Sequence, residues 1–179
     1  LKGQIRSALH RSDFKSAMGL LQHAEKLFPT SPWVLKHLLA ISRENKNFKK
    51  AEALTLRLED LGYFSSDQSK RQIASFQYQE AIQSQTPSDQ KEVLLRQAHY
   101  LDPSRHEVTE VFAQFLFDQG HKSYALSAIE ATWLLSPTQS LGNLYLKISA
   151  PKSVEDAYQV ALKLIKNNPS HPESLLLLS

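Results

Sequence analysis

The chain has 179 residues, 41% of them hydrophobic and 22% charged, proportions that are typical of globular proteins. Its formal net charge is only +3 and it contains no run of basic residues, so charge gives no indication of nucleic-acid binding. The absence of cysteine excludes disulfides, thiolate metal sites and cysteine-based catalysis. No apolar stretch approaches the roughly 20 residues that span a bilayer. The chain starts at Leu1 without a methionine and stops at Ser179, directly after the apolar run Leu175–Leu178, so we expect it to be the middle of a longer protein.

The first third of the chain contains one helical pattern twice. A short helix is predicted over residues 1–11, and a longer one follows from Asp13 to Phe28. A third helix is expected after Ser31, with Pro32 at its first position, and a fourth from Asn47. The second and fourth helices begin 34 residues apart and carry apolar residues at steps of three and four, which form one stripe along each helix. The stripes are Phe14, Ala17, Leu21, Ala24 and Phe28, then Phe48, Ala51, Leu54, Leu58 and Leu61.

The pattern is less regular after Gly62 and then recovers. A fifth helix is predicted after a cap at Ser65, and a sixth after Thr86–Asp89 that ends before Pro103. The fifth carries Ile73, Phe76, Tyr78, Ala81 and Ile82. Four more helices are then expected, separated by a turn at Gly120-His121, by Pro137 and by Ala150-Pro151, and a further helix starts at Pro172. Histidines at the turns, His121 and His171, are interpreted as caps, and Trp133 as a core residue.

A small residue and a closing residue are separated by twelve positions in four of the units. The pairs are Ala17 and Pro29, Ala51 and Tyr63, Ala125 and Pro137, and Ala157 and Pro169. A period near 34 residues with a small residue early and a proline late is typical of tetratricopeptide (TPR) helix pairs. A lone pair cannot bury its apolar stripe, so such pairs stack and share a core. We therefore predict an all-α, right-handed TPR-type α-solenoid, with the four alanines buried where helices cross.

The predicted organisation is a single superhelical domain of about five repeats. Their approximate boundaries are 1–29, 30–63, 64–103, 104–137 and 138–169, with the start of a further helix over 170–179. The middle repeat is the least regular, because Lys91 stands where alanine is expected.

No arrangement of residues in the sequence predicts an active site. The chain has no Gly-rich phosphate loop, no His-Glu-x-x-His and no Gly-x-Ser-x-Gly motif. Adjacent acidic pairs, Glu59-Asp60 and Glu155-Asp156, point apart on a helix and are interpreted as solvated. The histidines are scattered without an i, i+4 pair. We therefore expect no catalytic residues, no metal site and no cofactor.

Binding in a TPR solenoid is expected on the concave face, which is lined mainly by the first helix of each pair. The outward positions of these helices form the candidate groove, basic at one end and acidic at the other, and suited to a partner segment of opposite polarity. The groove residues are Trp33, Lys36, His37 and Arg43, then Phe76, Gln77, Glu80 and Gln83, then Glu107, Glu110, Gln114, Phe117 and Asp118.

From Leu101 onward the chain resembles the HemY-like TPR proteins of proteobacteria. The resemblance is carried by Leu101-Asp102-Pro103, Gly120, Ala125, Ile129-Glu130, Trp133, Leu141, Leu144-Tyr145 and Asn168-Pro169-Ser170-His171-Pro172-Glu173-Ser174. It implies the TPR domain of a bacterial inner-membrane protein that is tied to haem biosynthesis and is anchored by segments outside this chain.

Two functions follow from these patterns. The first is a non-catalytic scaffold that docks a protein or peptide partner, possible partners being haem-biosynthesis or membrane proteins. The second is a haem or porphyrin carrier, in which His37 or another groove histidine would ligate iron near Trp33 and Phe76. The sequence identifies neither the partner nor the side of the membrane.

Overall fold

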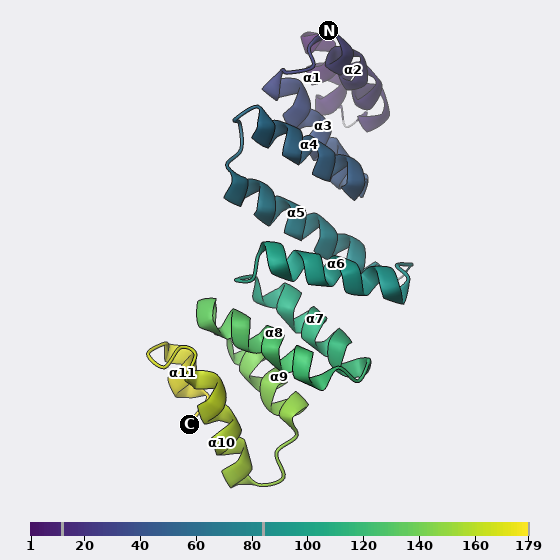
Figure 1. Cartoon of the computed structure of the whole chain (residues 1–179). Coiled ribbons are helices and arrows are strands. Elements are labelled where there is room, and N and C mark those ends of the chain that lie inside the picture. Colours follow the sequence, from purple (N-terminus) through teal and green to yellow (C-terminus); the bar gives the residue numbers. More distant parts are fainter. Residues whose placement is uncertain (12, 84, 179) are drawn as a thin grey trace. The chain divides into compact units, whose positions relative to one another are not determined.

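The computed structural model describes residues 1–11, 13–83 and 85–178, and this part of the chain contains eleven α-helices and no strand. The all-α prediction is therefore confirmed, and consecutive helices pack together as α1 with α2, α3 with α4, α7 with α8 and α9 with α10. Two compact units are distinguished, Leu1–Glu80 and the part of the chain from Ala81 onward. Within each unit, successive helices run back and forth, joined by short turns (Figure 1).

Unit 1 contains α1 (Lys2–His10), α2 (Phe14–Leu27), α3 (Pro32–Glu44), α4 (Phe48–Asp60) and α5 (Ser66–Ala81), whose last residue belongs to the second unit. Helix α3 packs against both α2 and α4. The core is a continuous cluster contributed by all five helices, in which Leu21, Leu35, Leu38 and Leu58 are completely buried. Arg57 of α4 links α4 to α2 by donating to Glu25 Oε1 at 2.7 Å and to the carbonyl of Pro29, just after α2.

Unit 2 contains α6 (Ser88–Leu101), α7 (His106–Asp118), α8 (Lys122–Leu135), α9 (Gln139–Ser149), α10 (Val154–Ile165) and α11 (Pro172–Leu176). Helix α7 packs against α6, α8 and α9, and α8 also contacts α10. Helices α8, α9 and α10 meet at Glu130, whose Oε1 accepts from Tyr145 Oη at 2.5 Å and lies 3.3 Å from Lys163 Nζ. Burial and the neighbouring Glu130 carboxylate raise the pKa of the Tyr145 hydroxyl well above its usual range.

The starts of the helices follow the capping chemistry that the sequence indicates. Asp13 and Asn47, the equivalent residues of the two copies, accept hydrogen bonds from the backbone N–H groups of Ser16 (3.1 Å) and Lys50 (3.2 Å). Ser65 and Gln68 form a reciprocal capping box before α5. His171 caps α11 through Nδ1, as predicted, whereas Ser31 and His121 occupy N-cap positions without a side-chain hydrogen bond.

Three of the four repeat alanines lie where the sequence places them. Ala17, Ala51 and Ala125 have no exposed surface, in agreement with close helix crossings. The prediction is wrong for Ala157, which is only half-buried near the start of α10. In that helix Ala161, one turn later, is buried instead, although Ala157 stands four residues after the N-cap Ser153, as Ala125 does after His121.

Other apolar positions also depart from the predicted stripes. Phe14, the first residue of α2, and Phe28, its C-cap, are exposed by 45% and 57%. Ile82 follows the last residue of α5 and is exposed by 50%. Trp133, by contrast, is completely buried, which confirms its assignment to the core. None of the helices in the described ranges combines the length and apolar character needed to traverse a bilayer.

Candidate functional site

In unit 1, four of the predicted groove residues lie on α3. The rings of Trp33 and His37 are both half-buried, with their centroids 4.2 Å apart. His37 Nδ1 donates to the Trp33 carbonyl at 2.7 Å, since a carbonyl oxygen can only accept. The Lys2 ammonium lies 5.3 Å from the centroid of the Trp33 ring. The helical turn that carries these residues therefore presents an aromatic surface with a cation above it.

Lys36 and Arg43 are exposed on α3 and each lies over an aromatic ring. Lys36 Nζ is 5.7 Å from the centroid of Phe64, and the Arg43 guanidinium is 5.8 Å from that of Phe76. The two residues are seven positions apart, which is close to two helical turns, so they share one side of α3. We call this surface, with Lys2 and Trp33, the basic face of α3.

The structure corrects the predicted groove positions on α5. Phe76 is only 2% exposed and stacks on Phe48 with 6.4 Å between the ring centroids, so it belongs to the core of unit 1. Gln77 is 9% exposed and donates to Glu52 Oε1 at 2.8 Å, which fixes its side chain within the unit. Glu80 and Gln83 are half-buried.

In unit 2, the predicted residues Glu110, Gln114 and Asp118 line one pocket. They follow each other at intervals of four residues and therefore lie on one side of α7. The cavity measures about 390 Å³ and also involves α6 and α9. We call it the α7 pocket; its walls are Lys91, Glu110, Val111, Gln114, Phe115, Asp118, Ser140 and Leu144.

Hydrogen bonds fix most of the polar groups in the α7 pocket. Gln114 donates from Nε2 to Asp118 Oδ1 at 2.7 Å and accepts at Oε1 from Lys147 Nζ at 3.0 Å. Lys91 Nζ lies 5.8 Å from the Phe115 ring centroid. Glu110 is the exception, because its Oε1 is buried and receives no hydrogen bond from any of the described residues. The pocket thus contains a carboxylate oxygen that lacks a donor.

Two other residues that were predicted at the acidic end of the groove, Glu107 and Phe117, do not line the α7 pocket. Glu107 is exposed and lies 3.8 Å from both Arg105 Nε and His106 Nε2, so its charge is paired on its own turn of the helix. Phe117 is half-buried.

Sequence reasoning missed a second cavity of unit 2, which measures about 550 Å³ and lies between α6 and α8. Phe112 and Leu116 of α7 form its floor, so it lies on the opposite side of α7 from the α7 pocket. We call it the α6–α8 pocket; its walls are Glu92, Arg96, His99, Phe112, Leu116, His121, Tyr124, Ser127 and Ala128. The available signal was the i, i+3 spacing of Arg96 with His99 and of His121 with Tyr124.

His99 is a half-buried ionisable group in the wall of the α6–α8 pocket. Its Nδ1 lies 3.0 Å from Thr109 Oγ1, and its ring packs 5.6 Å from that of Phe112. Burial lowers the pKa of the His99 imidazole below its ordinary value, so the side chain is neutral at pH 7. No group of three or more histidine, aspartate or glutamate side chains in the described ranges is placed to hold a metal ion.

No protein-family model and no curated protein matches the chain. Among solved structures it is similar to YrrB, described as a TPR protein with an unusual peptide-binding site, at 16% identity over 96% of this chain and 87% of that one, with a TM-score of 0.43. A thermophilic TPR protein of Thermus thermophilus gives 15% identity, coverage of 98% and 95%, and a TM-score of 0.35. A tetratricopeptide repeat protein of Parabacteroides merdae gives 12% identity, coverage of 98% and 68%, and a TM-score of 0.49.

Proposed function

We propose that this chain is a non-catalytic scaffold that binds a partner protein or peptide through the first helices of its pairs. Two surfaces serve this purpose, the basic face of α3 in unit 1 and the α7 pocket in unit 2. The observation that carries the proposal is Glu110 Oε1, which is buried at the pocket without a donor among the described residues. An unpaired buried acceptor is unfavourable by about 1–3 kcal/mol, more if charged, and a rotation of the Glu110 side chain toward a donor of the ligand would remove that penalty.

The chemistry of the α7 pocket defines the ligand. Glu110 and Asp118 are carboxylates two turns apart on α7, beside the apolar side chains of Val111, Phe115 and Leu144. A lysine or arginine side chain supplies donors to a carboxylate and an aliphatic stem to the apolar wall. The proposed occupant is therefore a basic residue of a partner peptide. The basic face of α3, with Lys36 and Arg43 exposed, is suited to an acidic segment.

The first test uses a random peptide-display library selected against the whole chain. We expect the retained peptides to be enriched in lysine and arginine, and the affinity of the best peptide to fall about tenfold in Glu110→Gln, because a charge-assisted hydrogen bond is lost. Glu107→Gln is the matched control, since it removes the same charge from the same helix outside the pocket. If both variants lose peptide affinity equally, the loss is explained by the change in net charge, and the proposed role of Glu110 is contradicted.

The second test reverses two charges on the basic face of α3. We expect the double variant K36E/R43E to weaken capture of acidic peptides at low salt and to slow their association, with a smaller difference at high salt, where exposed charges are screened. The control K15E/K49E carries the same charge change on the exposed sides of α2 and α4. Undiminished capture by K36E/R43E, with the helical circular dichroism retained, would remove the basic face of α3 from the binding surface.

We further propose that the scaffold is part of a HemY-like protein associated with the bacterial inner membrane and with haem biosynthesis. Its support is the order of residues from Leu101 to Ser174 given above. Fractionation of cells that express the natural full-length protein tests the location: recovery with the inner membrane supports it, and recovery in the supernatant contradicts it.

A further inference from the structure

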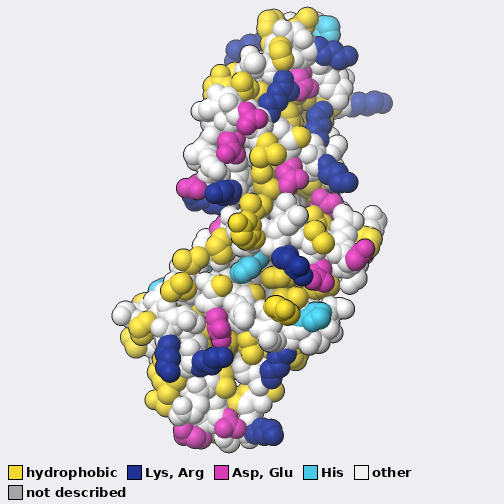
Figure 2. All heavy atoms as spheres, viewed as in Figure 1, with side chains coloured by type: hydrophobic (Ala, Val, Ile, Leu, Met, Phe, Trp, Pro, Cys, Tyr) yellow, Lys and Arg dark blue, Asp and Glu magenta, His cyan; other side chains and the backbone are white. Residues whose placement is uncertain are grey.

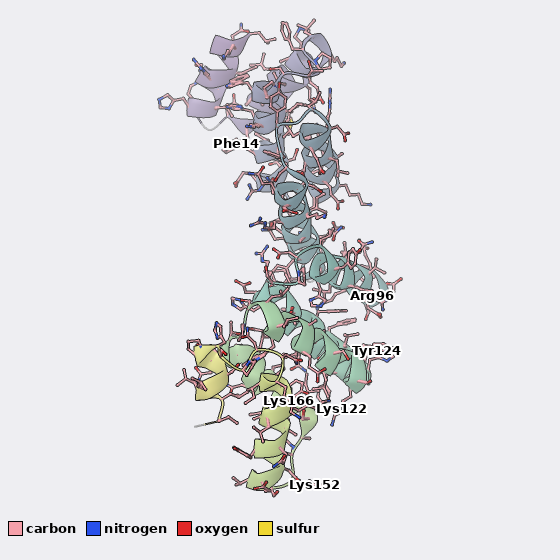
Figure 3. All side chains as sticks on the ribbon, turned by 60° about the vertical axis from the view of Figure 1, so that its left-hand side comes forward. Phe14, Arg96, Lys122, Tyr124, Lys152 and Lys166 are labelled. Atoms are coloured by element: carbon pink, nitrogen blue, oxygen red, sulfur yellow. The ribbon has the colours of Figure 1, made fainter. Side chains whose placement is uncertain are left out.

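The α6–α8 pocket has an apolar floor, and one of its walls is His99, whose Nδ1 atom is hydrogen-bonded to Thr109. Phe112, Leu116 and Ala128 are buried and form the bottom of the cavity. Tyr124, exposed by 70%, stands at its edge with the His121 ring 6.2 Å away in an edge-on arrangement. Figure 3 shows Arg96 of α6 and Tyr124 of α8 projecting on the same side of the unit. In Figure 2, hydrophobic side chains, histidines and a pair of opposite charges gather over these helices.

The proton on His99 is placed by a chain of hydrogen bonds that crosses unit 2. Thr132 Oγ1 lies 2.9 Å from the carbonyl oxygen of Pro103 and must donate to it, because a carbonyl can only accept. Thr109 Oγ1 is 2.7 Å from Thr132 Oγ1, and with the Thr132 proton already committed, Thr109 must be the donor of this pair. Thr109 Oγ1 has then no proton left for His99 and can only accept at 3.0 Å from Nδ1.

His99 is therefore the tautomer with its proton on Nδ1 and a lone pair on Nε2. Within the described part of the chain, Nε2 makes no hydrogen bond, although its residue lines the cavity. Thr109 and Thr132 are themselves completely buried, so water cannot reverse the direction of the chain. The pocket thus offers the Nε2 acceptor of His99 beside the apolar and aromatic side chains of Phe112, Leu116 and Tyr124, with Glu92, Arg96, His121 and Ser127 as its other polar walls.

We propose that the α6–α8 pocket binds a planar aromatic group that carries an N–H or O–H donor, of the indole or phenol class. The ring is buried against Phe112 and Leu116 beside Tyr124, and its donor bonds to Nε2 of His99. A charged ligand is not required, because Glu92 and Arg96 at the edge already pair with each other. The site is separate from the α7 pocket, since it uses the opposite side of α7.

The first arm of the test compares indole with benzofuran, which has nearly the same shape but an oxygen in place of the N–H. Binding to the intact chain is measured by NMR titration of the pocket resonances. We expect indole to bind at least about tenfold more tightly, because the benzofuran oxygen would face the lone pair of Nε2. Equal affinities, or shifts confined to residues outside the pocket, would overturn the proposal. Repeating the titration with N-acetyltryptophan amide distinguishes the sources: binding at least as tight as that of indole indicates a peptide side chain, and exclusion indicates a free small molecule.

The second arm tests the hydrogen-bond chain with Thr132→Val. Without the Thr132 hydroxyl, Thr109 is free to donate to Nδ1, so both tautomers of His99 become available. The difference in affinity between indole and benzofuran should therefore become smaller. The ¹⁵N chemical shifts of the His99 ring report the tautomer directly. Thr55→Val is the matched control, since Thr55 is equally buried but donates only to Ala51 of its own helix, at 2.9 Å. An Nε2-protonated His99 in the parent chain would refute the proposal even if Thr132→Val failed to fold.

Discussion

Replacing Trp133 by alanine is expected to lower the free energy of unfolding by about 3–5 kcal/mol, the range for truncating a large aromatic residue in a core. Trp133 has no exposed surface and its Nε1 donates to Ser174 Oγ at 3.1 Å. Ser174 in turn donates to the carbonyl of Asn168 at 2.6 Å, so the indole joins α8 to the segment that begins α11. Gly142 of α9 adjoins the same ring: a Cβ there would lie 3.4 Å from Trp133 Cη2. Denaturant unfolding followed by circular dichroism measures the loss.

Two further variants separate the contribution of the Trp133 ring volume to stability from that of its hydrogen bond to Ser174. Trp133→Phe retains most of the ring but leaves Ser174 Oγ without its donor, so its cost should be smaller than that of Trp133→Ala. Trp33→Ala is the matched control, because Trp33 is only half-buried on α3 and its Nε1 makes no hydrogen bond to the described residues. Should Trp33→Ala and Trp133→Ala destabilise the chain equally, the packing of α11 on Trp133 would not be a main source of stability.

The helices could be predicted from the sequence because their signals are local. Asp13 and Asn47 cap their own helices, and the spacing of apolar residues places Ala17 and Ala51 on the buried side without reference to distant segments. Such signals fail where tertiary context decides. Ala157 stands at the same first-turn position of its helix as the buried Ala125, yet it is only half-buried, so local spacing alone does not decide burial there.

The candidate site, too, could be predicted only in part from the sequence. Spacings of four place Glu110, Gln114 and Asp118 together, because one helix carries all three. The remaining walls of the α7 pocket come from α6 and α9, and no local spacing joins residues such as Lys91 and Ser140 to α7. The tautomer of His99 is even less predictable from the sequence, because it depends on hydrogen bonds that involve Thr109, Thr132 and the carbonyl of Pro103.

The burial of Ala125 leads to a second large effect. Ala125→Phe is expected to destabilise the chain by about 1–3 kcal/mol, because the added ring must displace side chains of a packed core. Ala125 lies in the first turn of α8 with no exposed surface, against α7. Thermal unfolding should therefore begin at a lower temperature than in the parent chain.

The matched control for this prediction is Ala157→Phe. Ala157 occupies the equivalent position of the next pair by sequence, 32 residues later, but solvent reaches it in the structure. A phenylalanine there can extend into water, so the melting temperature should stay close to that of the parent. If both substitutions destabilise the chain equally, the two positions are packed alike and the partial exposure of Ala157 in the structure is contradicted. If neither does, the close crossing of α7 and α8 at Ala125 is contradicted instead.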